Sequence, residues 1–184
     1  ADVTIIGGGA PNAECKDITV YVDANGLVNI SAADVDDGSS VLCGTGTISI
    51  DQNQFDCTNL GPNSVTLTIS DVIGNVDSCT ASVTVLDTVP PTALCTDITV
   101  TLDSNGFATI TTVDIDGGST DNCSIASITL DSTQFDCTTP SPQQVTLTVT
   151  DGSGNVDSCT ADVTIAGGGL PTAVCTDITV YLDN

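Results

Sequence analysis

Segment 15–20, Cys-Lys-Asp-Ile-Thr-Val, recurs as Cys-Thr-Asp-Ile-Thr-Val at 95–100 and again at 175–180. The cysteines follow the same period, because Cys15, Cys43, Cys57 and Cys79 have counterparts at Cys95, Cys123, Cys137 and Cys159. The period, about 80 residues, exceeds the range of about 20 to 50 residues that is typical of solenoid and propeller repeats. Each repeat is therefore predicted to be a separate domain with its own core.

The period divides the chain into four predicted segments. Residues 1–9 are expected to be the last strand and linker of a preceding repeat, 10–89 and 90–169 two full repeats, and 170–184 the first strand of a following one. Residues 1–5 also recur at 161–165, followed in both places by three glycines. We therefore expect a unit of two repeats in a longer tandem array.

Within each repeat, apolar and polar residues alternate with a period of two. In segment 18–22, Ile and two Val residues alternate with Thr and Tyr before an Asp-Ala-Asn-Gly turn, which predicts a strand and a hairpin. Further inward-facing positions are predicted at Val28, Ile30, Ile48, Ile50, Val65, Leu67, Ile69, Ala81, Val83, Val85, Ala108, Ile110, Ile128, Leu130, Val145, Leu147, Val149, Ala161, Val163 and Ile165. Helical periodicity is absent. About seven short strands per repeat predict an all-β fold of tandem immunoglobulin-like β-sandwich domains of about 80 residues, with a small closed barrel as the alternative.

The charge balance excludes several functions. The chain has 24 acidic residues and one basic residue, Lys16, which gives a formal net charge of -23 at pH 7. Nothing in such a chain neutralises phosphates, so we expect no binding to nucleic acid. The apolar stretches are too short for membrane insertion. Without histidine, and with no partner to activate a serine, the chain is predicted not to be an enzyme.

Four cysteines in so small a repeat favour structural disulfides and an extracellular or cell-surface location. Zinc is the competing interpretation, but the cysteines are too widely spaced to form the close pairs of zinc sites. Of the three possible pairings we favour Cys15 with Cys79 and Cys43 with Cys57, because first and last strands commonly lie side by side in this fold. The second repeat would then pair Cys95 with Cys159 and Cys123 with Cys137.

Segment 71–95 carries a family resemblance. Its Asp-Val-Ile-Gly-Asn-Val-Asp-Ser-Cys beginning and its Asp-Thr-Val-Pro-Pro end resemble the hyalin-repeat (HYR) pattern, and segment 151–159 matches the first half. The resemblance implies an immunoglobulin-like fold in tandem arrays of extracellular adhesion proteins. The added cysteine pair and the Asp-rich loops look most like large secreted proteins of Bacteroidetes-type bacteria.

Clustered carboxylates make Ca²⁺ a candidate cofactor, because calcium takes six to eight oxygen ligands. No organic cofactor is expected. Asp and Asn are also common turn residues that bond their own backbone, so a purely structural role is the alternative. The candidate ligands lie in the loops before the second cysteine and in the Asp-x-x-Gly-Asn turns: Asp34, Asp36, Asp37, Asp71, Asn75, Asp77, Asp114, Asp116, Asp121, Asp151, Asn155 and Asp157.

Glycans are a further candidate modification. Asn29 and Asn122 begin Asn-x-Ser triplets, and Thr88 and Ser132 fit the Asp-Ser/Thr-x pattern of bacterial O-glycosylation. We predict a structural subunit of an extracellular filament or cell-surface stalk, with copies of itself as partners. The alternative is a calcium-dependent adhesin module that binds a carbohydrate or protein ligand.

Overall fold

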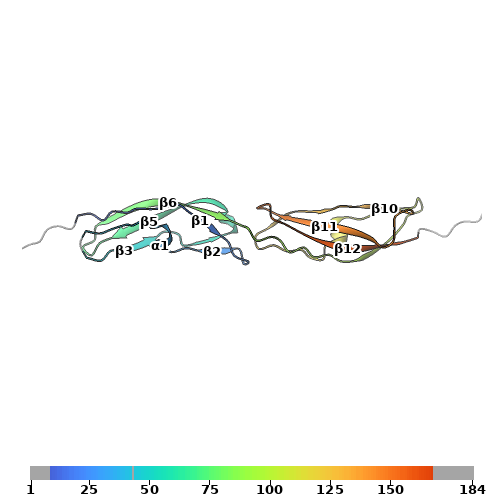
Figure 1. Ribbon diagram of the computed structural model, residues 1–184, viewed down its shortest axis with the longest axis horizontal. Coiled ribbons are helices and arrows are strands. Elements are labelled where there is room, and N and C mark those ends of the chain that lie inside the picture. Colours follow the sequence, from blue (N-terminus) through green and yellow to red (C-terminus); the bar gives the residue numbers. More distant parts are fainter. Residues whose placement is uncertain (1–8, 43, 168–184) are drawn as a thin grey trace, which may run out of the picture. The chain divides into compact units, whose positions relative to one another are not determined.

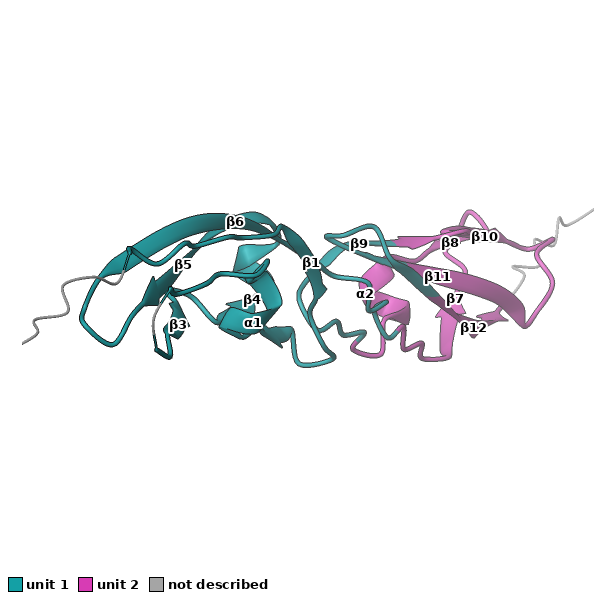
Figure 2. Cartoon of the chain, turned by 60° about the vertical axis from the view of Figure 1, so that its left-hand side comes forward, with its two compact units in different colours: residues 1–92, 119–128, 149–157 teal, residues 93–118, 129–148, 158–184 magenta. Residues whose placement is uncertain are grey.

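A computed structural model of the chain describes residues 9–42 and 44–167 (Figure 1). The chain divides into two compact units, coloured in Figure 2. Unit 1 comprises Ala1–Thr92, Ser119–Ile128 and Val149–Asp157, and unit 2 the rest. Unit 1 thus joins the first repeat to two segments of the second. The repeat boundaries stay predictions, and most of the two partial end repeats, with Cys175, lies outside the described residues.

The first repeat folds into two small sheets. One sheet has the strand order β1-β6-β5-β3, and the other pairs β2 with β4. A single helical turn, α1 (Ala32–Val35), follows β2, and a 3-10 turn, η1 (Cys57–Asn59), follows β4. The strands are β1 (Ile18–Tyr21), β2 (Leu27–Asn29), β3 (Thr47–Ile50), β4 (Gln54–Asp56), β5 (Gly61–Ser70) and β6 (Val76–Leu86).

The second repeat has the same topology, with strand order β7-β12-β11-β9 in one sheet and β8 paired with β10 in the other. Its helical turn is α2 (Thr112–Ile115). These paired sheets confirm the predicted all-β, sandwich-like fold. The strands are β7 (Ile98–Thr101), β8 (Phe107–Thr109), β9 (Ile125–Leu130), β10 (Gln134–Asp136), β11 (Gln143–Asp151) and β12 (Val156–Ala166).

The first and last strands of each repeat lie side by side, as the sequence predicts. β1 runs parallel to β6 with Ile18 opposite Val83, and β7 runs parallel to β12 with Ile98 opposite Val163. A disulfide adjoins each pair of strands. Cys15 is bonded to Cys79 and Cys95 to Cys159, with Cα–Cα distances of 5.8 and 5.7 Å. Both bonds agree with the favoured pairing.

The buried core follows the period of the sequence. Most alternating positions of β5, β6, β11 and β12 are buried as predicted, whereas Ile48 on β3 remains exposed. Phe55 and Phe135, one per repeat, are the largest fully buried side chains, although the sequence pattern does not assign them to the core. Their rings fill a core otherwise made of small aliphatic side chains.

Two short helices depart from the sequence prediction. Val35 on α1 and Ile115 on α2 are fully buried, although both stand in acidic segments that are predicted to be loops. One turn of helix is too short to produce a helical hydrophobic pattern. In the described part of the chain, every helix falls short of the length and apolar character needed to cross a membrane.

The core assignment predicts that Phe135→Ala lowers the free energy of unfolding by about 3–5 kcal/mol, because it leaves a cavity in a fully buried position. Phe107 is 57% exposed in the same repeat, so Phe107→Ala is the matched control and should change the stability by less than about 0.5 kcal/mol. Urea unfolding measures both values. Equal losses in the two variants would contradict the described core.

Candidate functional site

The acidic loops at 34–37 and 114–116 act first as helix caps. The Asp34 carboxylate accepts hydrogen bonds from the Ser31 backbone N–H at 2.6 Å and from the Ser31 hydroxyl at 2.7 Å. Asp114 makes the same two bonds to Thr111, at 2.7 and 2.8 Å. These bonds lower the pKa of both carboxyl groups, with the backbone bond the larger cause. Each carboxylate therefore closes a capping box at the start of a helical turn.

Asp71 and Asp151 occupy equivalent turns after β5 and at the end of β11. In each turn Oδ1 accepts two backbone N–H bonds and Oδ2 accepts the Nδ2–H of the asparagine four residues later, Asn75 or Asn155. Burial raises the pKa of both carboxyl groups, but the asparagine side-chain and backbone hydrogen bonds outweigh it and leave the pKa lowered. Both groups are therefore ionised at neutral pH.

The five remaining predicted carboxylate ligands are half-buried, except for the exposed Asp37. Asp77 accepts the backbone N–H of Ala13 at 2.8 Å, and Asp36 accepts that of Ser39 at 2.9 Å. Asp116 accepts the backbone N–H of Gly118 at 3.2 Å. Asp37 is exposed and Asp157 half-buried. These five carboxylates do not gather with a third acidic residue within the described ranges.

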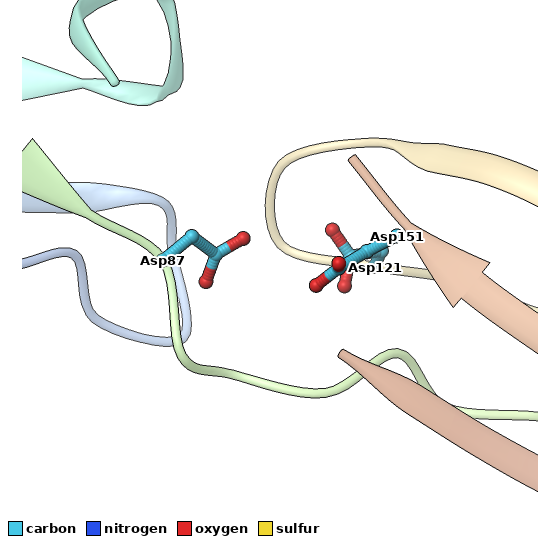
Figure 3. A group of neighbouring side chains, drawn as sticks. All are labelled: Asp87, Asp121 and Asp151. Atoms are coloured by element: carbon cyan, nitrogen blue, oxygen red, sulfur yellow. The ribbon is translucent and has the colours of Figure 1, made fainter. Parts of the chain in front are cut away.

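One place in the described chain brings three acidic side chains together: Asp87, Asp121 and Asp151 (Figure 3). One carboxylate oxygen from each lies within 4.8 Å of the others. Asp87 follows β6, Asp121 precedes β9, and Asp151 ends β11, and all three belong to unit 1. Asp87 and Asp151 are only 7% and 2% exposed. Asp121 and Asp151 are predicted ligands, whereas the sequence places Asp87 in a linker.

Two asparagines hold this carboxylate cluster in place. The Asn155 side chain donates its Nδ2–H to Asp151 and to the backbone carbonyl of Asp87, at 2.7 and 3.2 Å. The Asn122 side chain donates to Asp87 Oδ1 at 3.3 Å and to the backbone carbonyl of Asp23 at 3.0 Å. The segments that carry the three carboxylates are thus linked by hydrogen bonds within unit 1.

A disulfide at Cys123, two residues after Asp121, corrects the predicted pairing. Cys57 is bonded to Cys123, with a Cα–Cα distance of 5.3 Å, and not to Cys43. The predicted Cys123–Cys137 pair is accordingly wrong, and Cys137 is a free, exposed cysteine. Cys43 lies outside the described residues. The bond therefore connects cysteines of two consecutive repeats instead of two cysteines of one repeat.

Gly26 makes room for this disulfide. Its φ is 73°, in the left-handed region, and a Cβ atom placed there would lie 2.6 Å from Cys57 Sγ and 2.7 Å from the Asn122 carbonyl oxygen. Its repeat equivalent, Gly106, has a φ of 83° but no atom within 4 Å of the same Cβ position. The backbone at 26 therefore has a packing constraint that the backbone at 106 lacks.

The candidate glycosylation residues lie in different surroundings. Asn29 and Thr88 are exposed, whereas Ser132 and Asn122 are half-buried. The Asn122 amide nitrogen already donates to Asp23 and Asp87, so a glycan attached there would replace at least one of these bonds. Glycosylation at all four residues stays a prediction.

Comparison with known proteins identifies no family for the chain. No family model and no curated protein sequence matches it. Similar solved structures include human protocadherin-24 EC1-2 (10% identity, 86% of this chain and 99% of that chain, TM-score 0.45) and Drosophila N-cadherin EC1-4 (10%, 87% and 50%, 0.44). Another is the four N-terminal Ig domains of Dscam1 (13%, 89% and 48%, 0.41). The chain spans about half the length of the latter two. The hyalin-repeat resemblance and a bacterial source stay predictions.

The contact at Gly26 predicts different costs for two equivalent substitutions. Gly26→Ala and Gly106→Ala both place a side chain at positive φ, at a cost of about 1–2 kcal/mol each. Gly26→Ala should lose about 1–3 kcal/mol more, because its methyl group overlaps Cys57 and Asn122. Denaturant unfolding of the two variants measures the difference. If both lose the same stability, the backbone at 26 does not touch the disulfide.

The capping carboxylates predict a loss of stability in acid. Because the pKa of Asp34 and Asp114 is lower in the folded protein than the value of about 3.9 in the unfolded chain, their contribution is present above about pH 4. It is lost as the pH falls through the lowered folded pKa. The Asp34→Asn, Asp114→Asn double variant should therefore lose less stability between pH 5 and pH 2 than the unaltered protein. Urea unfolding across this range tests the difference, and parallel profiles would contradict the capping role.

Proposed function

We propose that the chain is a structural subunit of an extracellular filament or cell-surface stalk built from tandem immunoglobulin-like repeats, with no catalytic role. The observation that carries this proposal is the Cys57–Cys123 disulfide, which covalently links one repeat to the next. Such a bond limits the independent movement of consecutive repeats. A stalk or filament needs this property, whereas a mobile binding module does not.

Because the sequence is periodic, the same bond is expected between every two consecutive repeats of an array. Cys137 is the repeat equivalent of Cys57 and is exposed. Its partner would be the cysteine of a following repeat that is equivalent to Cys123. Bond formation joins the two sulfur atoms while an external low-molecular-weight disulfide accepts two electrons and two protons and leaves as two thiols. Every repeat would then be bonded to both of its neighbours.

The surface chemistry also supports an assembly of identical repeats. The alternate residues of the long strands that face outward are largely Thr and Ser, and the net charge of -23 opposes unspecific association of the sheets. Contacts that repeat along one direction produce an open fibre and not a closed oligomer. Copies of the same repeat are thus the partners that we propose, with surface glycans as an additional feature.

The predicted calcium ion belongs to this proposal as a stabiliser of consecutive repeats. The three carboxylates of the cluster come from segments of both repeats that fold together in unit 1. A calcium-dependent adhesin would use the same ion, but would also need a ligand surface. The filament is therefore the function that we favour.

Two observations on the native, full-length protein test the filament. Electron microscopy should show fibres with an axial spacing that corresponds to one or two repeats. Mass spectrometry of unreduced peptides should find the peptide with Cys137 bonded to a cysteine of a following repeat. Dispersed monomers that bind a sugar or protein ligand saturably would favour the adhesin instead, and a free Cys137 thiol in the native array would refute the continuous disulfide chain.

A further inference from the structure

Asp87, Asp121 and Asp151 bring three negative charges into a partly buried space that no protein cation neutralises. The whole chain holds one basic side chain, Lys16, and no histidine. Among the described residues, the electrostatic effect of Lys16 falls on Asp34 and Asp36, two other carboxylates. Burying charged carboxylates without a counter-charge is strongly unfavourable. A cation bound from solution would supply the compensating positive charge.

Two buried side-chain oxygen atoms, one on a cluster residue and one on the residue that follows it, lack a hydrogen-bond donor. They are Asp121 Oδ1 and Asn122 Oδ1, and they are the only such side-chain atoms within the described residues. Asp121 Oδ2 accepts the backbone N–H groups of Cys123 and Ser124, both at 2.8 Å, which fixes the carboxylate and leaves Oδ1 unpartnered. Buried oxygens without a donor are rare in folded proteins and need a partner. A cation or a water molecule can satisfy such an oxygen, and the three neighbouring carboxylates favour a cation.

We propose that Asp87, Asp121 and Asp151 bind one Ca²⁺ ion, with the Asn122 side-chain oxygen as a neighbouring ligand. The donor set consists of oxygen atoms alone, which calcium and magnesium prefer. Calcium–oxygen bonds of about 2.3–2.6 Å allow two ligands on one ion to lie up to about 5 Å apart. The carboxylate oxygens all lie within 4.8 Å of one another, which is inside the span of one calcium ion. Calcium also tolerates irregular coordination geometry, whereas magnesium requires a nearly ideal octahedron.

The surrounding hydrogen bonds orient the ligands. Asp151 is held by Asn155, and Asp87 Oδ1 accepts the backbone N–H of Val89 at 3.0 Å and the Asn122 side chain. Such outer contacts restrict the rotation of each carboxylate and reduce the entropy that ion binding would otherwise lose. The ion would join segments that are separate in sequence but lie in one unit.

The preceding junction of the sequence does not repeat this set of carboxylates. One period of 80 residues earlier, Asp87 is replaced by Gly7 and Asp121 by Val41, and only Asp151 keeps its counterpart, Asp71. Asp71 makes the same turn bonds as Asp151 but belongs to no carboxylate cluster in the described part of the chain. The chain therefore contains its own control residue.

Calorimetric titration of the 184-residue chain with CaCl₂ tests the site. The buffer contains about 0.15 M NaCl, which screens unspecific attraction of the ion to the anionic surface. We expect one saturable ion per chain with a Kd of about 0.1–1 mM, as in extracellular calcium modules. Asp121→Asn and Asp151→Asn should each weaken binding at least about tenfold, and Asp71→Asn should leave it unchanged. MgCl₂ should bind more weakly than CaCl₂.

Thermal unfolding provides a second readout. Calcium should raise the Tm of the unaltered protein and of Asp71→Asn relative to chelator, but not that of Asp121→Asn. The hydrogen bonds that Asp121 accepts come from the backbone of Cys123 and Ser124, close by in the sequence. Asp121→Asn is therefore expected to stay folded even if Asp151→Asn unfolds. Equal binding by Asp71→Asn and Asp121→Asn, or no saturable binding below about 10 mM Ca²⁺, would overturn the site. The calcium site rests only on the calcium part of the proposed function. Calcium binding without fibres would refute the filament and keep the site. Fibres that persist in chelator, without calcium binding by the chain, would refute the site and keep the filament.

Discussion

Covalent cross-links compensate for the small hydrophobic core. The core cluster of the first repeat holds nine buried side chains, of which one is a phenylalanine and the other eight are Val, Ile, Leu and Ala. In a domain of about 80 residues with so little aromatic area, the free energy gained by burying apolar surface exceeds the cost in chain entropy by only a few kcal/mol. The disulfides of Cys15 with Cys79 and of Cys57 with Cys123 span sequence separations of 64 and 66, and closing each loop is worth about 4 kcal/mol in chain entropy. The strand pairing and the carboxylate cluster both depend on segments that these bonds hold.

The many aspartates have a local structural task before any other. Asp34, Asp71, Asp114 and Asp151 each accept at least one backbone N–H bond that would otherwise lack a partner in a tight turn. Because these hydrogen bonds lower the pKa of the four carboxyl groups, the turns that shape the loops also contribute to the negative potential of the protein. This negative potential is concentrated where Asp87, Asp121 and Asp151 lie together.

Periodicity predicted the fold because strand alternation and the repeat spacing are both local or translational properties of the chain. The same periodicity concealed the Cys57 pairing. Cys43 and Cys123 are equivalent positions of adjacent repeats. The periodic pattern therefore does not distinguish a Cys57–Cys43 bond from a Cys57–Cys123 bond. Only the spatial approach of Asn122 and Cys123 to Gly26 and Cys57 decides between them. Asp87 was missed for a related reason, because it stands in a Pro-rich linker, although its replacement by Gly167 marks a break in the period. The capping box of Ser31 and Asp34, in contrast, is a readable Ser-x-x-Asp pattern.

The interleaved disulfides give the chain a limited mechanical length. A force that pulls on Cys15 and Cys159 passes through the Cys15–Cys79 bond, the sixteen residues to Cys95, and the Cys95–Cys159 bond. Even with every hydrogen bond broken, this path extends to only about 65 Å, whereas the reduced chain would reach about 500 Å. Once the Cys15–Cys79 bond is reduced, the force passes through β1 and β6 instead, and their parallel pairing places the hydrogen bonds between them in shear. The redox state of the surroundings thus determines whether the protein behaves as an inextensible tether or as a long compliant one.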